Sequence, residues 1–185
     1  MSHSLKSRIL LLISGLVLLV SCQASPPNYP KVQISRVSSG QSVEWIDKSQ
    51  QPPVIQQGRL MGIDAPDLAQ EPWGKQAKQR LEELIGIPAK GSVSVEFDST
   101  DADKYGRKFV YLWKDGRLLN EQLLKDGCVL ASMRSSSSAS TSVSGMKYRD
   151  RFIRGSQYAR IMAQGIWNPA QPMRMSPSEF RKEER

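Results

Sequence analysis

The chain has 185 residues and a formal net charge of +8, a length that suits one ordinary domain and a charge that favours polyanionic partners. Two cysteines are too few for a disulfide framework, so stability must come from a packed core. The only histidine, His3, lies in a segment with the features of an export signal, which excludes histidine acid–base chemistry from the mature domain.

Residues 1–21 have the order of a secretory signal, with Lys6 and Arg8 followed by an apolar run at 9–20 and then small residues. The run is too short to span a bilayer, which requires about 20 residues. Residues 19–22 (LVSC) resemble the bacterial lipoprotein box. This resemblance implies an exported, extracytoplasmic protein that is anchored to a bacterial membrane by acyl chains on Cys22. The alternative is a plain secretory signal in which Cys22 has no such role.

The segment at 22–30 is polar and rich in proline, which predicts a tether between the membrane and a domain that begins near Lys31. Lipidation of Cys22 would leave Cys128 as the only thiol of the mature domain, and therefore no disulfide. Loss of residues 1–21 removes two basic and no acidic side chains and lowers the net charge to +6. The remaining charge still favours nucleic acid or an anionic lipid surface.

Three strands are predicted at 31–37, 42–47 and 54–63, where apolar residues alternate or cluster between turn-forming SSGQ and KSQQPP segments. An amphipathic helix is predicted at 71–86, with Pro72 in its first turn and Gly86 at its end. The predicted fold therefore begins with an antiparallel three-stranded unit and a helix.

Two more strands are predicted at 92–97 and 109–113, followed by helices at about 119–125 and 146–164. The serine-rich loop at 134–145 offers nothing to bury, and the tail at 170–185 is expected to be disordered or a frayed helix. Five strands and about three helices predict an α+β, mainly β fold that is compatible with a five-stranded OB-fold barrel. Periodicity alone leaves other α+β arrangements open.

The first candidate site follows the third predicted strand, in the segment RLMGIDAPD at 59–67. Pro66 stiffens this loop, so that the carboxylates of Asp64 and Asp67 can be aimed repeatably. Hard oxygen ligands on a rigid turn suit Ca²⁺ or Mg²⁺. The alternative is that both aspartates are ordinary turn residues exposed to water.

The second candidate site is the segment DADKYGR at 101–107, between the fourth and fifth strands. Its guanidinium, on Arg107, offers a planar fork that fits two phosphate oxygens and remains charged at any relevant pH. Taken alone, the segment is a polar hairpin loop.

Taken together, these motifs resemble the staphylococcal thermonuclease family. The resemblance covers nearly all of residues 31–169 and rests on motifs in family order: Arg59, IDAPD at 63–67, PWGKQAK at 72–78, DKYGR at 103–107, NEQL at 120–123, Gly127 and GIW at 165–167. It implies an OB-fold barrel that cleaves phosphodiester bonds in DNA and RNA with Ca²⁺. We expect a monomer with nucleic acid as its partner.

By this resemblance, Arg59 and Arg107 grip the scissile phosphate and stabilise charge on the pentacoordinate transition state. Asp64 and the backbone carbonyl of Ala65 would bind calcium. Asp67 falls where the family usually has a glutamate that positions or deprotonates the attacking water. Because aspartate is shorter by one methylene, the water would be held less well.

Lys104 and Tyr105 would contact a neighbouring phosphate of the substrate, again by resemblance. The turn between the first two strands departs from the family, which usually has DGDT where residues 39–42 read SGQS. The missing acid is a calcium ligand in the family, and Gln41 can offer only a neutral amide oxygen in its place. Its loss would weaken the metal site.

Two functions therefore remain open. The first is an exported, membrane-tethered endonuclease that hydrolyses nucleic acid with a divalent cation and is weakened by the change at Gln41. The second is a degenerate member that has lost catalysis and keeps the barrel as a binding or interaction module.

Overall fold

A computed structural model describes residues 28–88, 91–132 and 147–184. The predicted signal at 1–21, Cys22, most of the tether and the serine-rich loop at 134–145 lie outside these residues, so their roles stay predictions. Within the described ranges, no helix is long and apolar enough to span a bilayer.

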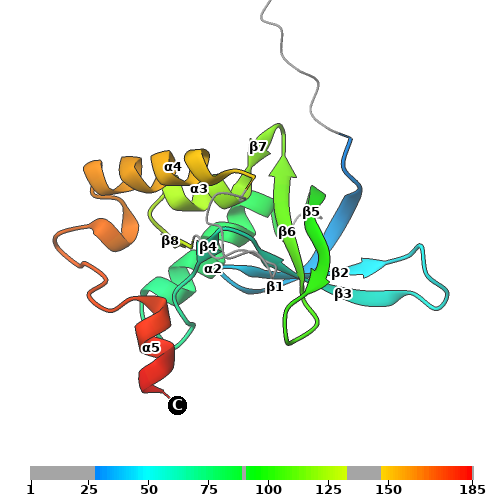
Figure 1. The fold of residues 1–185 in the computed structure, drawn as a ribbon, viewed down its shortest axis with the longest axis horizontal. Helices are drawn as coiled ribbons and strands as arrows, with labels where there is room; N and C mark the ends of the chain where they lie inside the picture. Colours follow the sequence, from blue (N-terminus) through cyan, green and yellow to red (C-terminus); the bar gives the residue numbers. More distant parts are fainter. Residues whose placement is uncertain (1–27, 89–90, 133–146, 185) are drawn as a thin grey trace, which may run out of the picture.

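Five strands form a closed barrel, as the sequence predicts. They are β1 (Lys31–Ser39), β2 (Ser42–Asp47), β3 (Val54–Leu60), β5 (Ser92–Ala102) and β6 (Lys108–Lys114). The sheet runs in the order β3-β2-β1-β5-β6, and a parallel pairing between β3 and β6 closes it (Figure 1). The short β7 (Arg117–Leu118) extends β6 through a hairpin. An α+β, mainly β barrel of the OB type is therefore confirmed.

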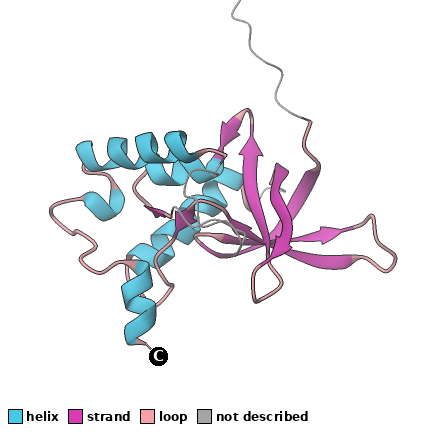
Figure 2. Ribbon diagram, in the orientation of Figure 1, coloured by secondary structure: helices cyan, strands magenta, loops and turns pink. Residues whose placement is uncertain are grey.

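Helices cover one side of the barrel (Figure 2). The described ranges contain α2 (Trp73–Ile85), α3 (Leu119–Lys125), α4 (Arg149–Ile161), α5 (Pro177–Glu183) and the 3-10 helix η2 (Gly165–Trp167). The apolar stripe of α2 buries Ala77, Leu81 and Ile85, and the helix ends at Gly86, whose φ of 85° suits glycine. The α4 helix is shorter at both ends than its predicted range of 146–164.

The helices that cover one side of the barrel explain why β6 has a continuous run of apolar residues. Because helices pack on the outer face of this strand, Val110, Tyr111 and Leu112 are all fully buried. The Tyr111 ring lies 4.8 Å from that of Tyr148 in an edge-on contact and 6.3 Å from that of Phe152 in α4. The strand is thus held on both faces.

A buried carboxylate fastens the start of α4 to the barrel. Glu96 in β5 is 4% exposed and accepts hydrogen bonds from Trp113 Nε1 (2.8 Å), the Tyr148 hydroxyl (2.8 Å) and Lys147. Burial raises the pKa of Glu96, but these three donors together outweigh it, so the net pKa is lowered. Folding therefore favours the ionised carboxylate.

The third predicted strand divides at a corner. In place of one strand at 54–63, β3 ends at Leu60 and β4 (Ile63–Asp64) begins after Gly62, whose φ is 79°. Buried Asn120 holds the corner by donating to the carbonyls of Met61 (2.9 Å) and Val110 (3.3 Å). The β4 strand then pairs with β8 (Leu130–Ala131) in a second small sheet.

The C-terminal segment at 170–185 contains an ordered helix where we expected a disordered tail or a frayed helix. Ser176 and Glu179 form a complete capping box at the start of α5, and Pro177 occupies its first turn. Gln70 donates to the Met175 carbonyl at 2.7 Å and thereby ties the segment to the loop after β4. The hydrogen bond between Gln70 and Met175 therefore holds the segment that carries α5 near the loop after β4.

Candidate functional site

Barrel closure brings the two predicted arginine segments together. In the parallel register between β3 and β6, Arg59 pairs with Phe109, two residues after Arg107. The side chains of Arg59 and Arg107 consequently line one cavity of about 320 Å³. Lys104, Tyr105 and Asp103 line the same cavity, so the structure places the predicted phosphate-binding groups of both segments in a single site.

Arg107 is held by Asp103, a residue to which the sequence analysis assigned no role. The Asp103 Oδ2 atom accepts from Arg107 Nε at 2.8 Å and lies 2.6 Å from Nη2. Its Oδ1 atom accepts from the backbone N–H groups of Tyr105 (2.9 Å) and Arg107 (3.1 Å). One carboxylate therefore closes the turn and aims the guanidinium. An aspartate that can bond the backbone two residues later, four residues before an arginine, is the signal that could have revealed it.

The third guanidinium nitrogen of Arg107 contacts β2, in the first hairpin of the barrel. Its Nη1 donates to the Ser42 hydroxyl at 3.0 Å. Arg107 and Tyr105 also line a second cavity of about 420 Å³ with residues of β1, β2 and β3. The Tyr105 side chain, 65% exposed, lies with its ring 5.2 Å from the Arg107 guanidinium and 4.9 Å from Lys104 Nζ. Tyr105 and Arg107 thus form a wall shared by two adjoining cavities.

Arg59 lies at the end of β3 with its side chain 25% exposed. Its Nη2 atom is 4.0 Å from Asp64 Oδ1, a long ion pair. Burial lowers the pKa of Arg59, and the charge of Arg107 lowers it further. Asp64 and Asp103 oppose this shift in pKa, and Arg181 adds to it. Several guanidiniums therefore crowd this site, and an incoming anion would relieve their mutual repulsion.

Asp64 carries an ion pair that the sequence analysis did not predict. Arg181 of α5 donates from Nη2 to Asp64 Oδ1 at 2.7 Å and to Oδ2 at 2.8 Å. Its Nη1 donates to the Ala65 carbonyl at 3.4 Å. No local pattern could have paired these residues, because they are separated by 117 positions.

Gln41 does reach the loop that contains Asp64. It is 8% exposed, and its Oε1 atom accepts from the Ala65 N–H at 3.0 Å. The oxygen that we considered a weak metal ligand is therefore bonded to the backbone.

The donor set fits a weak cation site. Asp64 and the Ala65 carbonyl converge on one cationic group, the Arg181 guanidinium, so they can face a cation together. Among the described residues, no group of three or more His, Cys, Asp or Glu side chains could hold a metal ion. One carboxylate and one carbonyl are few ligands for Ca²⁺, which takes six to eight oxygens and would need water or substrate to complete its shell.

Asp67 is the predicted site residue that the structure does not bring to the arginines. Its Oδ1 atom accepts from the Ala69 N–H at 3.1 Å, and its carbonyl accepts from the Gln70 N–H at 2.9 Å. In the described part of the chain, no hydrogen bond or ion pair joins it to Arg59, Asp64 or Arg107. Its carboxylate closes a local turn, as the simpler reading of DAPD predicts.

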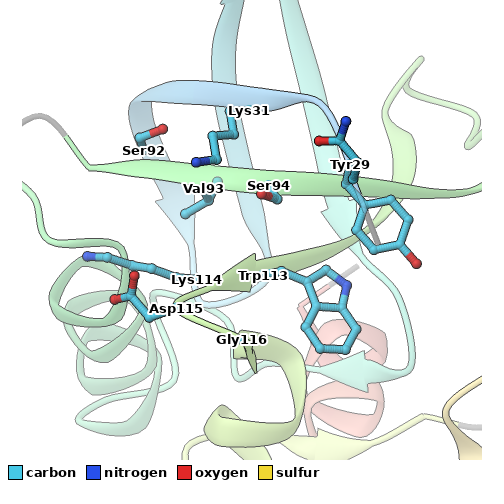
Figure 3. A pocket seen from close by; sticks show the side chains of 10 residues that line it. Tyr29, Lys31, Ser92, Val93, Ser94, Trp113, Lys114, Asp115 and Gly116 are labelled. Carbon is cyan, nitrogen blue, oxygen red and sulfur yellow. The ribbon is translucent and has the colours of Figure 1, made fainter. Parts of the chain in front are cut away.

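A larger pocket of about 640 Å³ lies at the opposite end of β6 (Figure 3). The rings of Tyr29 and Trp113, stacked at 6.3 Å, lie at one end of it, and Lys114 lies at the other. Neither Arg59 nor Arg107 lines this larger pocket. The candidate site is therefore identified by its arginines and not by the size of the cavity.

The chain is similar in sequence to several known nucleases. A model of the family described as "Staphylococcal nuclease homologue" matches residues 57–169. The SPbeta prophage-derived endonuclease YokF of Bacillus subtilis is 34% identical over 116 residues, which cover 60% of this chain and 36% of YokF.

Two further relatives match longer stretches. The thermonuclease of Staphylococcus hyicus is 25% identical over 153 residues, or 80% of this chain and 82% of that protein. Endonuclease YncB of Bacillus subtilis is 30% identical over 143 residues, or 74% of this chain and 61% of YncB. The chain thus spans most of one relative but less than two thirds of YokF and YncB.

Proposed function

Because the chain belongs to the staphylococcal nuclease homologue family, we propose that it is an endonuclease that hydrolyses phosphodiester bonds of DNA or RNA with a divalent cation. The observation that carries this proposal is that Arg59 and Arg107 line one cavity. Phosphoryl transfer requires mainly positioning and electrostatic stabilisation, and two fixed guanidiniums can supply both.

In the proposed reaction, Arg59 and Arg107 bind the scissile phosphate and stabilise the charge that develops on its oxygens. Asp103 positions Arg107 by binding its Nε and Nη2 atoms, and the Nη1 atom donates to the Ser42 hydroxyl. Tyr105, in the wall between the two cavities, and Lys104, in the first cavity, would contact the next phosphate along the strand. A backbone passing this wall could be held at two successive phosphates.

Asp64 and the Ala65 carbonyl would hold the cation. When bound, the cation would add positive charge beside the reacting phosphate. We retain Asp67 as the group that would position or deprotonate water, although one of its carboxylate oxygens accepts from the Ala69 N–H in a local turn. The local turn that holds Asp67 and the neutral side chain of Gln41 both predict slow catalysis.

The test is cleavage of heat-denatured DNA with millimolar Ca²⁺ by wild type, Arg107→Ala and a matched control, Arg117→Ala. Arg117 is exposed and lies in β7, at the opposite end of β6. Loss of one preorganised donor should lower the rate by about 100- to 1000-fold, whereas the control should retain wild-type activity. Equal activity of Arg107→Ala and wild type would refute the assignment.

A binding module is the second candidate function. It is favoured by the ion pair that occupies Asp64 and by the small number of acidic ligands around it. A folded protein that binds single-stranded DNA, yet cleaves nothing with Ca²⁺, Mg²⁺ or Mn²⁺, would support this function instead.

Export and attachment to a membrane by Cys22 belong to the same proposal and rest on the sequence at 1–22. Expression of wild type and Cys22→Ser in a bacterial host tests this step. Wild type should sediment with membranes and incorporate labelled palmitate, and the variant should do neither. Equal palmitate incorporation in both proteins would exclude Cys22 as the anchor.

A further inference from the structure

The C-terminal helix places a cationic side chain on the oxygens that would bind the metal. Arg181 contacts both carboxylate oxygens of Asp64 and the carbonyl of Ala65. The Asp64 side chain is 16% exposed and that of Arg181 is 35% exposed, so the pair is partly shielded from solvent. A single guanidinium nitrogen, Nη2, bridges both carboxylate oxygens, while Nη1 reaches the Ala65 carbonyl, and hydrogen bonds between two charged groups are stronger than neutral ones.

Occupation of these oxygens has a direct steric consequence. A divalent cation bound by Asp64 and the Ala65 carbonyl would require the space taken by the Arg181 guanidinium. Two cationic groups sharing one carboxylate would also repel each other, and Arg59 already lies 4.0 Å from Asp64. Arg181 and the metal therefore exclude each other.

The segment that carries Arg181 is attached in a way that permits release. The α5 helix has seven residues, too short to be stable alone, and it depends on its capping box and on the contacts of Arg181 with Asp64 and Ala65. Its hydrogen bond from Gln70 to Met175 lies before the helix, so this attachment can persist while Arg181 departs. The family model ends at residue 169, so the matched region does not include α5.

We propose that Arg181 is the resident cation of the metal site and competes with the divalent cation, so that the metal binds only after Arg181 releases Asp64. This inference rests on the proposed function for the identity of the metal site. It makes the C-terminal helix an inhibitory element that raises the cation concentration required for activity. The apparent affinity for the metal equals the intrinsic affinity of the free site multiplied by the fraction of molecules in which Asp64 is free.

The test is direct titration of Ca²⁺ into the purified protein by calorimetry, without nucleic acid. Arg181→Gln should bind Ca²⁺ about 10-fold more tightly than wild type, as expected if Asp64 is free in about a tenth of wild-type molecules. Lys182→Gln is the matched control, because it removes one positive charge from the adjacent, exposed position of the same helix. Its affinity should stay within about twofold of wild type if contact, and not overall charge, is responsible.

Two more variants test the contact itself and the location of the bound metal. Arg181→Lys keeps the charge but has a single nitrogen in place of the Nη1 and Nη2 that contact Ala65 and Asp64, so its affinity should lie between those of wild type and Arg181→Gln. Asp64→Asn in the Arg181→Gln background should abolish binding, because it removes the carboxylate. Binding that survives this change would overturn the inference, since the metal would then lie elsewhere.

The outcomes also separate this inference from the proposed function. Tighter Ca²⁺ binding by Arg181→Gln without cleavage of DNA supports the competition and argues against the nuclease. Cleavage by wild type, together with unchanged affinity in Arg181→Gln, overturns the competition and leaves the nuclease intact. Absence of any Ca²⁺ binding by Arg181→Gln also overturns the inference, because an unblocked site must bind the metal.

Discussion

The carboxylate of Asp103 offers the sharpest test of how the site is built, because it performs two separable tasks. One oxygen accepts from the backbone N–H groups of Tyr105 and Arg107, and the other faces the Arg107 guanidinium. Asp103→Ala removes both functions. Asp103→Asn retains one oxygen for the backbone but turns an NH₂ group toward the donors of Arg107.

The stability cost follows from the backbone contacts. A hydrogen bond to a charged acceptor contributes about 1.5–3 kcal/mol, and the exposed loop lets water replace part of this. We therefore expect Asp103→Ala to lose about 1.5 kcal/mol. At roughly 2–4 °C per kcal/mol for a chain of this size, the Tm should fall by about 3–6 °C. Asp103→Asn should lose less, since its oxygen still accepts from the turn.

The activity cost should be similar in both variants, because both release the Arg107 guanidinium. Misplacement of a reacting group by about 1 Å costs on the order of 100-fold, which is the expected fall in kcat/KM on denatured DNA. Asp115→Asn is the matched control, because Asp115 is exposed in the turn at the other end of β6. Wild-type or higher kcat/KM in Asp103→Asn would refute the positioning role.

Three further predictions concern the corner, the metal site and the buried carboxylate. Asn120→Ala should cost about 3 kcal/mol in urea unfolding, because it leaves buried backbone groups unpaired; a loss below about 1 kcal/mol would contradict this. Gln41→Glu keeps an acceptor for the Ala65 N–H and adds a negative charge, so calorimetry should show tighter Ca²⁺ binding, and unchanged affinity would argue against a site there. Folding lowers the pKa of Glu96 below 4.5, so its ionised form stabilises the protein above about pH 4.5 and this contribution is lost as the pH falls through the lower folded value. The stability difference between wild type and Glu96→Gln should therefore shrink between about pH 6 and about pH 3, and a constant difference would refute the assignment.

Local patterns were sufficient for the main strands of the barrel and for the helix that follows the third strand. Alternation in β5 and the apolar stripe of α2 each follow from a periodicity that the sequence displays directly. The corner at Gly62 was missed because the apolar residues of 54–63 were interpreted as parts of one strand. What bends the chain there is Asn120, which binds the Met61 carbonyl from 59 positions away.

The sequence by itself determined the strands, the helices and the chemical groups that can bind phosphate, because these depend on neighbouring residues and on side-chain type. Only the tertiary structure decided which of these groups lie next to each other. Closure between β3 and β6 joins Arg59 to Arg107, and the return of α5 sets Arg181 on Asp64, while Asp67 remains in its own turn. The physical reason is that such pairings are fixed by packing between distant segments, and no periodicity along the chain records which distant segments will touch.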